Sequence, residues 1–172
     1  MTQPSLRPLD LAVALHLALR SEDGFESMAE VLGIGLGSAH RSVQRLMSAG
    51  LVLPHRRAVS PSALHEFLVH GARFAFYPVH GPEAEGVPTA HSGPPLRDQI
   101  ESGRAIVWPS AEGTVRGDSL APLYDGAPQL ARTAPELYEL LTLVDAIRVG
   151  RARERKLAAE ALGARLKGAA HT

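Results

Sequence analysis

Side chains that can hydrogen-bond to the edges of nucleic-acid bases are concentrated between positions 38 and 45. Arginine can bind guanine through two parallel hydrogen bonds, and glutamine can bind adenine in the same way. Serine and histidine can reach phosphate oxygens or base edges. The segment contains Ser38, His40, Arg41, Gln44 and Arg45. We expect Arg41, Gln44 and Arg45 to read bases, with Ser38 and His40 assisting.

The charge distribution supports the same chemistry, although the total charge does not. The chain has 18 Lys and Arg residues and 18 Asp and Glu residues, so its formal net charge is zero. A neutral chain gives no general support for a nucleic-acid partner. Between Val31 and His65, however, there is no Asp or Glu, and the segment contains Arg41, Arg45, Arg56 and Arg57. A purely basic stretch of this kind predicts a local contact with a polyanion.

Two helices separated by a short turn are expected to position these side chains. The first begins at Ser27, a favourable N-cap with Glu30 three residues later, and ends at Gly33, which can adopt a positive φ. The second runs from about Leu36 to just before Gly50. It turns its small and apolar residues inward: Ala39, Val43 and Leu46.

The flanking segments predict further helix and a small hairpin. A helix is expected to start at Pro8, and apolar residues on more than one of its faces require cover from the rest of the chain or from a second subunit. Short strands are predicted over 51–53 and 58–59. The tip between them carries His55, Arg56 and Arg57, which we expect to contact phosphates or the minor groove.

The segment from Leu6 to about Val59 resembles the winged helix-turn-helix domain of bacterial transcriptional regulators of the broad MarR-, IclR- and Lrp-like kind. The resemblance covers about the first third of the chain and rests on residues 28–33, 40–46 and 49–52. This family commonly has a Ser or Thr cap before the second helix, where this sequence has Gly35. The resemblance implies that the second helix enters the major groove of double-stranded DNA and that the protein is a homodimer.

The whole chain is expected to be α+β, with three parts. Residues 1–70 form the winged helix-turn-helix domain, residues 71–132 a loop-rich region with short strands, and residues 133–172 a helical pair available for dimerisation. The central part is rich in Pro and Gly. Strands are predicted over 73–77 and 104–108, with an extended loop over 81–95 between them. Thr133 and Glu136 match a capping box at the start of the third part.

Other candidate sites carry weaker patterns. His80, His91 and Asp98 lack the spacing of a metal site, and there is no cysteine, so no metal or other cofactor is predicted. The glycines at 33–37 follow a helix rather than a strand, which argues against a nucleotide-binding loop. The loop 86–95 is either a binding loop or a rigid segment packed across the surface. The cluster around 148–156 is either a second phosphate contact or a solvated basic face.

These patterns predict a sequence-specific DNA-binding transcriptional regulator, acting as a homodimeric repressor. The alternative is a protein-interaction module, such as the antitoxin and autoregulator of a toxin–antitoxin or defence operon, with a protein partner. An enzyme is not expected, because no nucleophile motif or cluster of carboxylates is present. The apolar runs are too short to span a bilayer, and there is no signal peptide or cysteine, so no membrane partner is predicted and a cytoplasmic location is expected.

Overall fold

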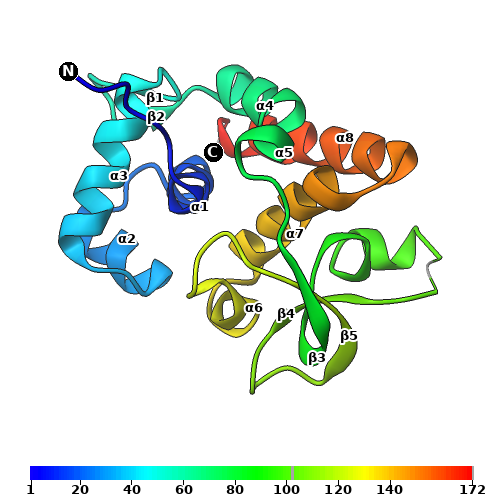
Figure 1. The fold of residues 1–172 in the computed structure, drawn as a ribbon. Helices are drawn as coiled ribbons and strands as arrows, with labels where there is room; N and C mark the ends of the chain where they lie inside the picture. The colour runs from blue at the N-terminus through cyan, green and yellow to red at the C-terminus, as the bar shows by residue number, and fades with distance from the viewer. Residues whose placement is uncertain (102, 172) are drawn as a thin grey trace.

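A computed structural model describes residues 1–101 and 103–171 as a mixed α+β fold. The chain begins with three helices that pack on one another (Figure 1): α1 (Pro8–Leu19), α2 (Phe25–Leu32) and α3 (Leu36–Ser48). Pro8 is the first residue of α1, where its missing N–H costs no helical hydrogen bond. Gly33 ends α2 in the left-handed conformation, at φ +67°. Gly50 follows α3 at φ +76°.

A two-stranded hairpin and a helical connection follow. Strands β1 (Val52–Leu53) and β2 (Ala58–Val59) pair antiparallel. Helix α4 (Pro61–His70) leads directly into the single turn α5 (Ala72–Ala75). The predicted hairpin strands are therefore present in the structure.

A small closed sheet forms the centre of the chain. Strand β3 (His80–Pro88) pairs antiparallel with both β4 (Ile106–Pro109) and β5 (Val115–Leu120), and β4 and β5 pair parallel. The strands cross so tightly that a Cβ on Gly86 would lie 2.0 Å from the Trp108 carbonyl oxygen. Glycine is therefore required at this crossing.

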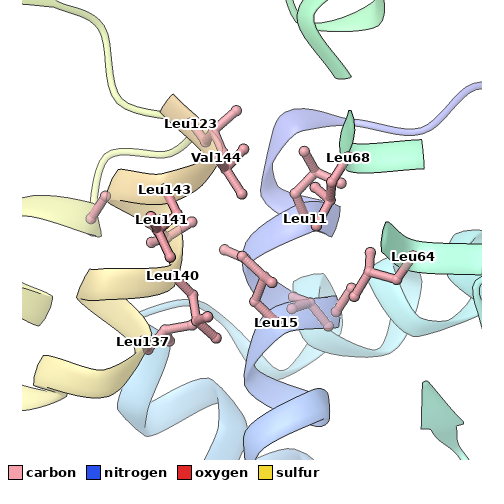
Figure 2. Close-up of a cluster of buried hydrophobic side chains, with 14 of the residues drawn as sticks. Leu11, Leu15, Leu64, Leu68, Leu123, Leu137, Leu140, Leu141, Leu143 and Val144 are labelled. Carbon is pink, nitrogen blue, oxygen red and sulfur yellow. The ribbon is translucent and has the colours of Figure 1, made fainter. Parts of the chain in front are cut away.

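The last helices complete the core. Short turns η3 (Ala127–Gln129) and α6 (Leu130–Thr133) precede α7 (Pro135–Val149) and α8 (Ala152–Ala169). Helix α7 is buried along most of its length, and Figure 2 shows its leucines facing Leu11 and Leu15 of α1, with Leu64 and Leu68 of α4 nearby. One hydrophobic cluster contains residues from all three parts of the chain. The rest of the chain thus covers the additional apolar faces of α1.

A buried carboxylate joins the central sheet to α7. Asp145 is fully buried and accepts hydrogen bonds from the Thr89 hydroxyl (2.7 Å), the Trp108 indole N–H (2.7 Å) and the Arg148 guanidinium (2.7 Å). Arg148 also donates from Nε to the Phe76 carbonyl oxygen at 2.8 Å. Buried charges require such partners. The network therefore links α7 to strand β4, to the turn after β3 and to the segment after α5.

Four sequence-based expectations about local structure are wrong. A strand was expected over 73–77, but residues 72–75 form a helical turn. This turn continues α4 and ends at Phe76, whose carbonyl oxygen accepts a hydrogen bond from Arg148. The expected loop over 81–95 is strand β3 up to Pro88. Helix α2 begins at Phe25 with Gly24 as its N-cap, ahead of Ser27. Thr133 ends α6, with its hydroxyl on the Gln129 carbonyl oxygen, so it does not cap α7.

Replacement of Asp145 by alanine is expected to destabilise the protein strongly. The change leaves Arg148 charged and buried and the Trp108 and Thr89 donors without their acceptor. Losing one member of a buried ion pair costs about 3–5 kcal/mol. Urea unfolding measures the change in the free energy of unfolding. The exposed Asp125→Ala is the control, with a change of at most about 0.5 kcal/mol. A loss below about 1 kcal/mol for Asp145→Ala would contradict this role.

Candidate nucleic-acid interface

Helix α3 buries one face and exposes another. Its inner face consists of Ala39, Ser42, Val43 and Leu46, which are buried against α1 and α2. The opposite face carries the exposed residues Gly37, His40, Arg41, Gln44 and Ser48. The spacing follows the helical repeat, so these residues lie along one side of the helix. Within this face, Arg41 donates to the Ser38 hydroxyl at 3.3 Å.

A buried carboxylate of α1 fixes the orientation of α3. Asp10 is fully buried and receives Arg45 Nε and Nη2, each at 2.8 Å, together with the Ser42 hydroxyl at 2.7 Å and the Arg7 N–H at 2.8 Å. The hydrogen bond to Asp10 raises the pKa of the Arg45 guanidinium. A bidentate arginine–carboxylate pair fixes direction as well as distance. Asp10 therefore sets the rotation of α3 about its own axis.

A second cluster joins α3 to the hairpin through Phe25. The ring of His40 stacks on the ring of Phe25, with a centroid distance of 3.7 Å. The guanidinium of Arg57 lies 4.7 Å from the centroid of the same ring and donates to the Asp23 carbonyl oxygen at 2.6 Å. Arg57 has φ +49°, so the turn places this side chain back against the helices. The hairpin is thereby held beside the start of α2.

The structure divides the eight predicted contact residues into two groups. Arg41, Gln44, His55 and Arg56 are exposed, whereas Ser38 is partly exposed and bonded to Arg41. Arg45 binds Asp10 and its side chain is 22% exposed, and Arg57 binds the Asp23 carbonyl oxygen. His40 is exposed but stacks on Phe25. Sequence reasoning missed the roles of Asp10 and Phe25. Asp10 gave one signal, as the only acidic residue within the apolar helix 8–19.

The chain ahead of α1 runs beside the outer face of α3. A groove of about 430 Å³ is lined by Gln3, Pro4, Ser5 and Leu6 on one side and by residues of α3 on the other, including Arg41, Gln44 and Arg45. These first residues are mostly exposed. They therefore border the face that carries Arg41 and Gln44.

A buried histidine lies behind the same helices. His16 Nε2 lies 3.0 Å from Asp23 Oδ2, and the imidazole is 3% exposed. Burial lowers the pKa of His16 below its ordinary value, although the Asp23 carboxylate acts in the opposite direction. The pair borders a cavity of about 470 Å³ that extends to the start of α7. His16 therefore lies in the core.

The structure also places the remaining candidate residues from the sequence. His91 Nε2 contacts the Arg104 carbonyl oxygen, and no group of three or more potential metal-ligating side chains occurs within 1–101 and 103–171. The segment 86–95 packs across α7: the Tyr138 hydroxyl donates to the Pro88 carbonyl oxygen, and the Thr142 hydroxyl to that of Pro94. Arg148 is buried against Asp145 and unavailable to a phosphate.

Comparison of the chain with protein-family models, with curated proteins and with solved structures gives no significant match. Among the helices that the structure describes, none combines the length and the apolar character needed to cross a membrane.

Asp10→Ala is expected to loosen α3 and lower stability. The change removes the acceptor of Arg45 and Ser42. Breaking such a pair lowers the free energy of unfolding by about 3 kcal/mol. This is the lower end of the usual range, because the partly exposed Arg45 can be hydrated again. Urea unfolding measures the loss, and amide hydrogen exchange is expected to accelerate in α3. The exposed Asp98→Ala serves as the control. Wild-type exchange throughout α3 in Asp10→Ala would rule out the proposed orientation by Asp10.

His16 is expected to make folding stability sensitive to pH. The unfolded chain takes up a proton on His16 near pH 6.5, but the folded protein does so only at lower pH. The stability contribution is therefore complete above pH 6.5 and decreases as the pH falls toward the lowered pKa. Urea unfolding at pH 7.5 and 5.5 should show a smaller loss for His16→Gln than for the wild type. The exposed His80→Gln should behave as the wild type. An equal loss in His16→Gln would contradict this.

Proposed function

We propose that the protein is a sequence-specific DNA-binding regulator, with residues 1–70 acting as a winged helix-turn-helix domain and α3 as the recognition helix. The single observation that carries the proposal is the outer face of α3, which exposes Arg41 and Gln44 and has no acidic residue. Acidic residues are absent from the whole segment between Val31 and His65. A helix of this kind fits the major groove, where arginine and glutamine discriminate between base pairs.

The roles of the basic residues differ under this proposal. Arg41 and Gln44 contact base edges, with Ser38 supporting Arg41, and His55 and Arg56 contact phosphates from the hairpin. Arg45 is a positioning residue, because its guanidinium is bound to Asp10. His40 holds α3 against Phe25 and Arg57 holds the hairpin against the same ring, so the two contacts set the spacing between the two contact regions.

The proposal includes a homodimeric repressor located in the cytoplasm. Two recognition helices related by a two-fold axis would read two half-sites about one helical turn apart. The burial of α7 leaves little of that helix for an interface between copies. A dimer contact would therefore use other surfaces than the α7 face.

Arg41→Ala and Gln44→Ala are expected to reduce discrimination between the protein's own upstream DNA and an unrelated duplex. A bidentate base contact provides about 1–3 kcal/mol of discrimination, so the ratio of the two Kd values should fall by roughly 5- to 150-fold. Fluorescence anisotropy with labelled duplexes, over a range of salt concentrations, measures both Kd values.

Arg56→Ala serves a separate purpose in the same assay. It should weaken binding to both duplexes and reduce the slope of log Kd against log salt by about 1, as loss of one phosphate contact requires. Arg97→Ala, an exposed arginine far along the chain, is the matched control and should leave both quantities unchanged. Absence of binding at low salt, or full discrimination by Arg41→Ala with Gln44→Ala, would refute the proposal.

A further inference from the structure

Three large apolar side chains remain in solvent where the chain leaves α5. Phe74 is 67% exposed, Tyr77 is 70% exposed and Val79 is 57% exposed. Single exposed apolar residues are common on protein surfaces, but here three lie within six positions of the chain. We call these three residues the linker patch.

The backbone of the linker patch is fixed. The Phe76 carbonyl oxygen accepts from Arg148 at 2.8 Å, and the Phe76 ring packs edge-on against Phe67, with centroids 6.2 Å apart. At the other end, the Val79 carbonyl oxygen accepts from the Ala121 N–H at 2.9 Å. Phe76 thus faces inward while Tyr77 and Val79 face solvent. The backbone that carries these apolar side chains is held in position before any partner binds, which limits the backbone entropy lost on binding.

A basic groove adjoins the linker patch. It has a volume of about 290 Å³ and lies between α5, the end of α4 and α8. Its lining includes Phe74, His70, Arg73, Arg155 and Lys156, and contains no Asp or Glu. The Arg73 guanidinium lies 4.5 Å from the centroid of the Phe74 ring.

The cations of this groove have no acidic partner among the residues that the structure describes. Arg155 donates to the Gly150 carbonyl oxygen at 2.9 Å. No ion pair among residues 1–101 and 103–171 involves Arg73, Arg155 or Lys156. The groove therefore combines an apolar wall with positive charge that no described ion pair neutralises.

We propose that the linker patch and the basic groove bind a different protein, through an acidic segment that carries a large apolar side chain. Aromatic residues and arginine are the types that contribute most to binding at protein interfaces. The positive charge of the groove selects an acidic partner and disfavours a basic one.

A second copy of this chain fits the surface poorly. Two-fold symmetry places the same residues on both sides of an interface. A two-fold contact centred on the groove would bring Arg155 and Lys156 of the two copies together, and like charges at an interface repel.

The partner site and α3 are separate surfaces, because the basic groove contains no residue of α3. Figure 1 shows α3 at the left edge, whereas α5 and the segment that follows it lie in the middle of the view. The inference therefore does not depend on DNA binding. The protein partner can bind whether or not DNA is bound at α3.

Photocrosslinking from position 77 in cells of the native host tests this inference. Tyr77→p-benzoylphenylalanine retains an aromatic ring and reacts only with what lies against the linker patch. The expected product is one protein, other than this chain, whose crosslinked peptide has net negative charge and an apolar residue. Arg155→Glu with Lys156→Glu should reduce the crosslink at least fivefold. Lys167→Glu, an exposed cation further along α8, is the matched control and should not.

Each other result overturns the inference. A crosslink to a second copy of this chain would identify a self-association surface, and a crosslink to nucleic acid would identify a nucleic-acid contact. A yield no higher than from the exposed position Gln99 would mean that nothing binds there. A crosslink that persists in the charge-reversed variant would show that the basic groove is not involved. Circular dichroism of each purified variant checks that it folds as the wild type does.

Discussion

The buried carboxylate of Asp145 determines how the second half of the molecule is assembled. It lies in the middle of α7 and accepts hydrogen bonds from Thr89, Trp108 and Arg148, which belong to separate parts of the chain. Because an unpaired buried charge is costly, these donors must all be in position when the core is formed. The small closed sheet, the segment after α5 and α7 are thereby joined into one packing unit. Helix α7 in turn contacts α1, so the first three helices rest on this unit.

Asp10 has a similar role for the surface of α3. It is buried in α1 and binds Arg45 and Ser42 from the neighbouring helix. The pair fixes which side of α3 faces outward, and that side carries Arg41 and Gln44. Two arginines with similar sequence context therefore have different surroundings. Arg45 contributes to the position of the helix, and Arg41 is exposed to solvent.

The sequence allowed good predictions where local patterns determine structure. The end of α2 follows from Gly33, and the extent of α3 follows from Gly50 and the helical repeat of Ala39, Val43 and Leu46. The hairpin follows from two short apolar runs around a basic turn. The predictions failed where contacts between residues far apart in the sequence determine the local structure. Arg45 and Asp10 are 35 positions apart, so their pairing has no local signature. Alternating aromatic residues over 73–77 suggest a strand, but residues 72–75 form a helical turn. It ends at Phe76, whose carbonyl oxygen accepts a hydrogen bond from the distant Arg148.

The central sheet was missed in part for a different reason. Strand β3 contains Gly81, Pro82, Gly86 and Pro88, and these residue types are uncommon in ordinary strands. In this closed sheet a glycine is required at position 86, because the neighbouring backbone lies so close that there is no space for a side chain. Only the three-dimensional arrangement shows this requirement. The sequence also could not show which predicted contact residues already bind other parts of the protein, because this depends on the positions of Asp10, Asp23 and Phe25.

The most direct measurement of the central claim is amide hydrogen exchange of the whole chain with and without its own upstream DNA. The account predicts slower exchange in α3 and in the hairpin 52–59 when DNA is bound, and unchanged exchange in residues 74–79 and at the start of α8. Protection confined to the start of α8, or no protection in α3, would contradict the account.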